Sequence, residues 1–207
     1  MTLPIGCLVS GRGSNLQAVI EAIARGEVDA EIRLVISNHP GVPALDRAAK
    51  AGIEACTVTA QGFPSRREQQ IEMARLLEQR GVELVVLGGF DRIVVPELIE
   101  RFPQRMINIH PSLLPAFANT LHAQREALEY GAKVAGCTVH IVTTDVDAGP
   151  ILVQACVPVL EDDTEEALAA RILEQEHRIL PQAIQLFAER RVRIEGRRAV
   201  IGPPNPS

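Results

Sequence analysis

Short apolar runs alternate with amphipathic segments along the first ninety residues of the chain. Four runs of apolar, often β-branched residues predict strands at residues 5–9, 32–36, 55–58 and 84–87. Apolar residues that recur every three or four positions predict helices between them, at residues 15–24, 44–51 and 65–80. The last of these helices opens with Ser65 and Glu68, the pattern of a capping box. This alternation predicts a parallel sheet with right-handed crossovers.

The second half has a different rhythm. Further strands are predicted at residues 106–110, 137–142 and 151–159, and a helix at 124–130 lies between the first two of these strands. The strands at 137–142 and 151–159 are expected to form an antiparallel pair at the sheet edge. A capping box formed by Asp163 and Glu166 predicts a helix over residues 164–187, which Pro181 should kink or split. A hairpin about Glu195 and a frayed tail at 202–207 complete the chain.

No repeat, linker or low-complexity segment divides these elements. We therefore expect one α/β domain, a mostly parallel twisted sheet with helices on both faces, Rossmann-like in its N-terminal half and with an antiparallel edge in its C-terminal half.

Composition narrows the range of partners. The net charge of −5 argues against binding of nucleic acid or an anionic membrane, and no apolar run reaches the roughly 18 residues of a membrane span. The start of the chain shows no signal peptide, so we expect a cytoplasmic protein. The four cysteines are scattered and the histidines lack metal-ligand spacing, which predicts reduced thiols and no metal site.

A glycine-containing loop, residues 10–15, joins the first predicted strand to the first helix. Gly13 permits a tight turn, and the N–H groups of Ser14 and Asn15 at the helix start favour an anion such as phosphate. Leu16 stands where a dinucleotide fingerprint needs its third glycine, and no Gly-Lys-Ser/Thr of a Walker A loop follows. A plain tight turn with a capped helix is the alternative interpretation.

A polar cluster is predicted at the carboxyl end of the strand at 106–110. Asn108 and His110 lie on the same side of that strand, and such strand ends form the ligand crevice of open α/β sheets. An amide beside an imidazole suits acyl transfer, since both can stabilise an oxyanion. Asp147, in a turn before Gly-Pro, can orient the histidine, although such turns are often structural. His140 fits a packed core position equally well.

Four segments taken together resemble one family. These are residues 10–17 (Ser-Gly-Arg-Gly-Ser-Asn-Leu-Gln), 108–115 (Asn-Ile-His-Pro-Ser-Leu-Leu-Pro), 136–140 (Gly-Cys-Thr-Val-His) and 147–151 (Asp-Ala-Gly-Pro-Ile). Their order and spacing over about residues 4–190 resemble the folate-dependent formyltransferases, and the first segment resembles the phosphoribosylglycinamide formyltransferases of purine biosynthesis. The resemblance implies a formyltransferase domain over residues 1–190, with a phosphate-binding half at 1–100 and a catalytic and folate-binding half at 101–190, followed by a C-terminal hairpin and tail at 191–207.

The resemblance also implies a reaction. A formyl group would pass from 10-formyltetrahydrofolate, the co-substrate, to the amine of 5'-phosphoribosylglycinamide on the way to IMP. Asn108 and His110 would stabilise the oxyanion. Asp147 would hold His110 charged and help, through water, to carry the amine proton to the departing folate nitrogen.

Binding residues follow from the same resemblance. Gly13, Ser14 and Asn15 would hold the substrate phosphate, and Glu176 its ribose. Arg66 would meet the glutamate tail of the folate, although an exposed helix cation is an equal alternative. The pterin would lie between two segments, whose residues are Phe90, Asp91, Arg92, Ile93 and Val94 on one side and Val142, Thr143 and Thr144 on the other.

Two departures from the family pattern bear on the substrate. Asp91 replaces the usual methionine beside the pterin, where an acid could repel a phosphate, change amine recognition or simply face solvent. The loop at 117–121 is one residue longer than the family's Phe-Pro-Gly loop.

Other functions therefore stay open: formyl transfer to another amino sugar nucleotide, formyltetrahydrofolate hydrolysis, or nucleotide binding without catalysis. The acidic balance and the absence of a second domain in this sequence speak against a tRNA-acting formyltransferase. Small molecules are the expected partners, and a monomer or a homodimer is compatible with the sequence.

Overall fold

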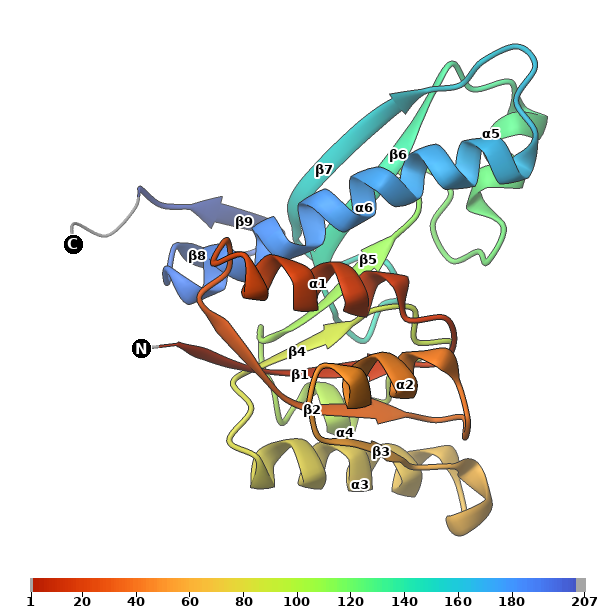
Figure 1. Ribbon diagram of the computed structural model, residues 1–207. Coiled ribbons are helices and arrows are strands. Elements are labelled where there is room, and N and C mark those ends of the chain that lie inside the picture. The colour runs from red at the N-terminus through yellow and green to blue at the C-terminus, as the bar shows by residue number, and fades with distance from the viewer. Residues whose placement is uncertain (1, 204–207) are drawn as a thin grey trace.

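The computed structural model describes residues 2–203, and within them nine strands form one continuous sheet (Figure 1). The strands are β1 (Leu3–Val9), β2 (Ala30–Ser37), β3 (Ala55–Thr57), β4 (Leu84–Leu87), β5 (Met106–His110), β6 (Val134–Ile141), β7 (Ile151–Pro158), β8 (Val192–Glu195) and β9 (Arg198–Ile201). The helices are α1 (Ser14–Ala24), α2 (Pro43–Lys50), α3 (Arg66–Gln79), α4 (Pro96–Ile99), α5 (Ala123–Tyr130) and α6 (Glu165–Ala188), with a 3-10 turn, η1, at Ala60–Gly62. The α/β class expected from the sequence is confirmed.

The N-terminal half is a parallel sheet in the order β3-β2-β1-β4-β5. All four residues of β4 are buried, as expected for a strand covered by helices on both faces. The strand order reverses between β1 and β4, because the chain first moves outward to β3 and then returns to the other side of β1. Such a switch point opens a crevice at the carboxyl ends of the strands, which is where open α/β sheets bind ligands.

The C-terminal half is mixed. Strand β6 pairs antiparallel with both β5 and β7, which confirms the expected antiparallel pairing. The pair is not the edge of the sheet, however, because the hairpin β8–β9 adds two more strands through a single bridge between Ile151 and Arg198. The hairpin turns at Gly196, whose φ of 58° lies in the left-handed region.

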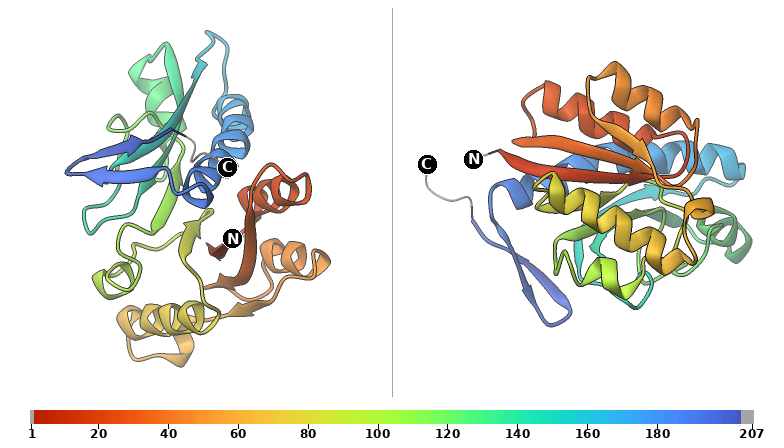
Figure 2. Two further views of the ribbon diagram at one scale, coloured as in Figure 1. Left: turned by 90° about the vertical axis from the view of Figure 1, so that its left-hand side faces the viewer. Right: turned by 90° about the horizontal axis from the view of Figure 1, so that it is seen from below.

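Two apolar layers lie between the sheet and the helices on its faces, and Figure 2 shows helices on both faces of the sheet. The larger layer lies under α1, α2, α5 and α6, and the smaller one under α3 and α4. The amphipathic periodicity of each helix fixes this arrangement: Leu16 and Val19 of α1 face the larger layer, and Met73 and Leu77 of α3 face the smaller.

Helix α6 departs from two expectations. Its N-cap is Thr164, whose side chain accepts the N–H of Ala167, whereas Asp163 binds the N–H of Leu160 and the guanidinium of Arg171. The helix also runs through Pro181 without a break. Proline in a helix interior costs about 3 kcal/mol. Ile179, Leu180, Ala183 and Ile184, which surround Pro181 on the helix, are fully buried, and their packing outweighs that cost.

Two short elements of the structure were not predicted from the sequence. Helix α4 is a single turn of four residues that begins at Pro96, and η1 has three residues, so neither carries a periodic pattern of useful length. Of the tail that was expected to fray, at 202–207, residues 204–207 lie outside the described residues.

Candidate active site

The glycine-containing loop lies at the switch point, between β1 and α1. Gly13 is the N-cap of α1 with φ 69°, and no side chain caps the helix. A Cβ on Gly13 would lie 2.6 Å from Ala44 Cβ and 2.7 Å from Ala44 Cα, so this position requires glycine for its backbone and for the close approach of α2. The first N–H groups of α1 have no intrahelical partner and stay available to an anion.

Arg47 of α2 supports this loop and was not anticipated from the sequence. Its Nε donates to the carbonyl oxygen of Arg12 at 2.9 Å, and a terminal nitrogen donates to Gln17 Oε1 at 3.2 Å. Arg47 therefore brings a positive charge to the start of α1. One arginine in a helix gives no sequence signal of this kind, because the contact depends on how α2 packs.

Asn15 and Glu176 are brought together from opposite ends of the chain. Asn15 Nδ2 donates to Glu176 Oε2 at 2.8 Å, and both side chains are buried. Burial raises the pKa of Glu176 to about 7, although the hydrogen bond from Asn15 opposes the shift. Within the described part of the chain, Asn15 Oδ1 is buried without a hydrogen-bond partner. The Asn15 side chain is thus committed to Glu176, and its backbone N–H is the group left for an anion.

The predicted trio of Asn108, His110 and Asp147 is assembled around β5. His110 Nδ1 lies 3.5 Å from Asp147 Oδ2, and the two side chains are 7% and 10% exposed. His110 Nε2 lies 2.9 Å from the carbonyl oxygen of Phe117. Because a carbonyl only accepts, Nε2 carries a proton and donates, and Nδ1 is the nitrogen that faces the carboxylate.

His140 of β6 completes the cluster. Its Nδ1 donates to the carbonyl oxygen of Ile141 at 2.9 Å, and its Nε2 lies 3.4 Å from Asn108 Nδ2 and 3.7 Å from Asp147 Oδ1. Burial lowers the pKa of His140, which keeps the ring neutral, so Nε2 accepts a hydrogen bond from the Asn108 amide. The sequence left His140 undecided, but β6 pairs it directly with Asn108, which places it in the site.

The loop after β5 covers the trio. Phe117 and Asn119 have positive φ values of 52° and 61°, and the N–H of Asn119 donates to Asp147 Oδ2 at 2.9 Å. Asp147 itself has φ 54°. The backbone of the 117–121 loop therefore holds both ends of the His110–Asp147 pair, a role that side-chain patterns in the sequence do not reveal.

The two segments expected to enclose a pterin lie on the same apolar layer. Phe90 and Val142 both pack, half-buried, against the smaller core cluster. Gln70 of α3 fixes the first segment, because its amide donates to Ile93 O at 3.0 Å and accepts from Val95 N at 2.8 Å. Thr143 Oγ1 donates to the carbonyl oxygen of Asp145 at 2.9 Å and so shapes the second segment.

The other residues expected to contact folate are more exposed. Arg66 begins α3 four positions before Gln70, so it lies on the helix face next to the first segment. Arg92 lies beside Asp91, and Ile93 is 57% exposed. Asp91 does not simply face solvent, because it contacts Ser10, Asn38 and His39.

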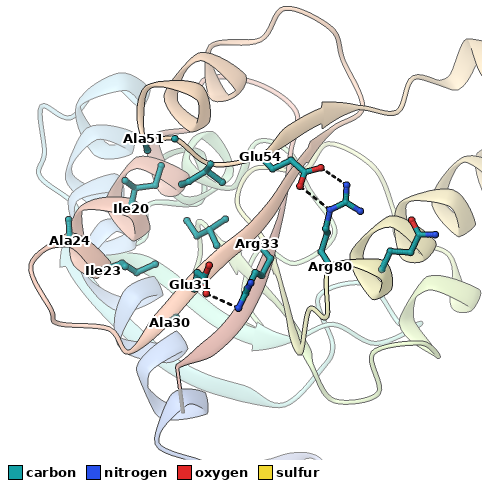
Figure 3. Close-up of a pocket in the computed structure, with 13 residues that line it drawn as sticks. Ile20, Ile23, Ala24, Ala30, Glu31, Arg33, Ala51, Glu54 and Arg80 are labelled. Carbon is teal, nitrogen blue, oxygen red and sulfur yellow. Dashed lines mark hydrogen bonds and ion pairs between the residues drawn. The ribbon is translucent and has the colours of Figure 1, made fainter.

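A separate open groove of about 670 Å³ lies at the amino-terminal end of β2 (Figure 3). Apolar side chains of α1 line it together with two ion pairs, Glu31 with Arg33 and Glu54 with Arg80. The trio lies beyond the carboxyl end of the parallel strands, so this groove is not part of the candidate site. Within residues 2–203, no group of three metal-ligating side chains is close enough to hold an ion, and no helix has the length and apolarity needed to cross a membrane.

This arrangement can carry out acyl transfer to an amine. A partly exposed amide and an imidazole face the same space, a carboxylate lies against the imidazole, and a loop with free N–H groups at the switch point offers an anion site. Comparisons with known proteins agree with this chemistry. The formyl transferase family matches residues 4–184.

Individual relatives support the same family assignment. The phosphoribosylglycinamide formyltransferase of Escherichia coli is 41% identical over 187 residues, which cover 90% of this chain and 88% of that protein. The trifunctional purine biosynthetic protein adenosine-3 of Drosophila pseudoobscura pseudoobscura is 50% identical over 89% of this chain, but the chain spans only 14% of that protein. The crystal structure of glycinamide ribonucleotide transformylase 1 from Symbiobacterium toebii superposes with a TM-score of 0.96 at 50% identity, covering 98% of this chain and 95% of that one. From the family match and these relatives, the chain belongs to the formyl transferase family.

Proposed function

We propose that the protein transfers the formyl group of 10-formyltetrahydrofolate to the amine of 5'-phosphoribosylglycinamide, in the cytoplasm. The observation that carries the proposal is the pair formed by His110 Nδ1 and Asp147 Oδ2, with His110 Nε2 fixed by Phe117 O and Asn108 fixed by His140. The relatives named above support the choice of substrate, since two of them bear that ribonucleotide in their names.

The substrate phosphate would bind at the start of α1. The N–H groups of Gly13, Ser14 and Asn15 supply donors there, the helix dipole favours an anion, and Arg47 adds a positive charge nearby. Glu176 lies next to this loop through its bond with Asn15, so it is placed to accept a hydroxyl of the ribose.

The folate would lie between residues 90–94 and 142–144. Phe90 and Val142 provide apolar surface for the pterin, and backbone groups of Asp91, Arg92, Ile93, Val94, Thr143 and Thr144 would provide polar contacts for its edge. Arg66 is placed to meet a carboxylate of the glutamate tail.

The chemistry follows from the positions of the protons. As the substrate amine attacks the formyl carbon, negative charge grows on the formyl oxygen, and His110 Nδ1–H and the second Nδ2–H of Asn108 can donate to it. The Asp147 carboxylate, 3.5 Å from Nδ1, orients the imidazole and would stabilise positive charge on it as the oxyanion forms. Asp147 also accepts the proton of the attacking amine through water, and the proton passes to the folate nitrogen as the carbon–nitrogen bond of the donor breaks.

An absorbance assay of folate deformylation tests this function. The purified protein is incubated with 10-formyltetrahydrofolate, with and without phosphoribosylglycinamide. We expect turnover only with the ribonucleotide, and a loss of about 10²-fold or more in kcat for His110→Ala and Asp147→Asn. Asp145→Asn is the matched control, because Asp145 is an exposed acid in the same loop.

The alternatives give different results. Turnover without any amine would replace the proposal with folate hydrolysis. Turnover that requires a different amino sugar nucleotide would keep the reaction and change the substrate. Folate that binds but is never deformylated, with any of these amines, would contradict catalysis altogether.

A further inference from the structure

Four polar side chains connect the carboxyl ends of three neighbouring strands at the switch point. Ser10 follows β1, Asn38 and His39 follow β2, and Asp91 lies beyond β4. Asp91 is the centre of the group: its Oδ1 accepts from Asn38 Nδ2 at 2.7 Å and lies 3.1 Å from Ser10 Oγ, and its Oδ2 lies 2.8 Å from His39 Nε2.

The backbone takes part in the same network. The N–H of Asp91 donates to Ser10 Oγ at 2.9 Å, and the N–H of Ser10 donates to the carbonyl oxygen of Gly89 at 3.1 Å. Asn38 is 6% exposed, and Ser10 Oγ lies 2.6 Å from its Oδ1, so the amide is held in a fixed orientation. The residues just before the proposed folate segment are therefore tied to the first residue of the proposed phosphate loop.

An exposed ion pair alone would not explain this arrangement. The Asp91 side chain is 45% exposed, and an isolated surface pair contributes little. Here one carboxylate meets a buried amide, a hydroxyl and an imidazole from two other strands, with the guanidinium of Arg92 3.4 Å away. Both carboxylate oxygens of Asp91 are therefore engaged by side chains of the protein itself.

We propose that Asp91 is a positioning residue: through Asn38, His39 and Ser10 it holds residues 90–94 in the place that folate binding requires. This inference rests on the proposed function, and it differs from a direct role of Asp91 in recognising either substrate. It also explains how an acid can occupy a position beside an anionic substrate, since its carboxylate is held by Asn38 and Ser10 and by the imidazole of His39.

A double-mutant cycle separates positioning from direct contact. We expect Asp91→Ala to raise the KM for 10-formyltetrahydrofolate about tenfold while kcat changes less than about threefold. His39→Ala should shift the same KM in the same direction by a smaller factor. The double variant should resemble Asp91→Ala alone, because both substitutions disrupt one network. Asp91→Asn keeps an oxygen acceptor for Asn38 and should recover part of the affinity.

Controls and a second readout make the test independent of turnover. Glu31→Ala removes an equally exposed ion pair, with Arg33, far from the site and should leave both KM values unchanged. Hydrogen exchange of residues 88–92 should accelerate in Asp91→Ala, and calorimetric titration with tetrahydrofolate should show weaker binding, even if the ribonucleotide proves not to be the substrate. Multiplicative effects of the two single substitutions on KM, or unchanged exchange and folate affinity in Asp91→Ala, would overturn the inference.

Discussion

Glu176 is a carboxyl group buried in the candidate site. Its side chain is 7% exposed, and among the described residues it accepts a hydrogen bond from the amide of Asn15, a neutral donor. Burial raises its pKa from 4.5 to about 7, which corresponds to about 3 kcal/mol between the protonated and ionised forms. The carboxyl group is therefore protonated in the folded protein under mildly acidic conditions.

This shift predicts how stability depends on pH. The raised pKa means that the folded state loses free energy of unfolding as the pH rises from about 4.5 to about 7, since ionisation then occurs in the unfolded chain first. Glu176→Gln removes this titration and keeps a partner for Asn15. We expect the stability of the variant relative to wild type to rise by about 2 to 3 kcal/mol between pH 5 and pH 8 in urea unfolding.

Glu174→Gln is the control for this comparison, because Glu174 lies exposed on the same helix. Its stability should follow that of the wild type at every pH. Parallel pH profiles for Glu176→Gln and the wild type would show that the buried carboxyl does not titrate as described.

At the scale of elements, the turn between β1 and α1 depends on one glycine more than on the other. Gly13 has a positive φ and touches Ala44, whereas a Cβ on Gly11 would meet no atom within 4 Å. We expect Gly13→Ala to lower the free energy of unfolding by about 2 to 4 kcal/mol, from backbone strain and overpacking together. Its KM for the ribonucleotide should rise as well, because the N–H groups of α1 would be displaced.

Gly11→Ala provides a matched comparison in the same loop. Chemical denaturation of both variants, with KM measured alongside, should show a small effect for Gly11→Ala and a large one for Gly13→Ala. Equal losses in the two variants would mean that loop entropy, and not the contact with Ala44, determines stability here.

The elements were predictable where one physical cause dominates. Strands β4 and β5 match their predicted bounds, because a buried apolar run between turn residues leaves little choice. Pro181 was predicted to kink or split helix α6 because proline removes a backbone donor, but the helix is continuous, since burial of the residues around Pro181 outweighs that local cost. Local sequence cannot weigh a local penalty against packing that comes from distant parts of the chain.

In the site, too, some features were predictable from residue spacing and others depend on how distant elements pack. Asn108 and His110 share a strand, so alternation alone predicted that they face the same space. The contacts of Arg47 with Arg12, and of His39 with Asp91, join different elements, so residue spacing could not predict them. The backbone donors and acceptors at 117 and 119 are independent of side-chain identity, and for that reason motif analysis did not find them.

At the scale of the whole molecule, we expect the C-terminal hairpin, β8 and β9, to contribute to stability and not to the chemistry. Val192, Ile194 and Ala199 pack partly buried against the larger core, and one bridge joins β9 to β7. In Figure 2 the hairpin projects from the body of the protein. A chain that ends at Arg190 loses this packing, about 2 to 3 kcal/mol, and should melt about 5 to 10 °C lower.

The truncation is expected to lower stability without changing the kinetic constants. The KM values and kcat of the shortened chain should stay near those of the wild type at a temperature well below both melting points. A chain that ends at Pro203 controls for the loss of residues 204–207. A large loss of kcat in the chain ending at Arg190, with its fold intact by circular dichroism, would assign the hairpin a role in the site.

The bond between Asn15 and Glu176 joins residues 161 positions apart. On a ribosome that adds about 5 to 20 residues per second, Asn15 emerges roughly 10 to 30 s before its partner is made. Throughout that interval the phosphate loop exists without the helix that completes it. A ligand that binds at this loop therefore meets its complete site only on the nearly finished polypeptide, so a chain that stalls early gains no protection from it.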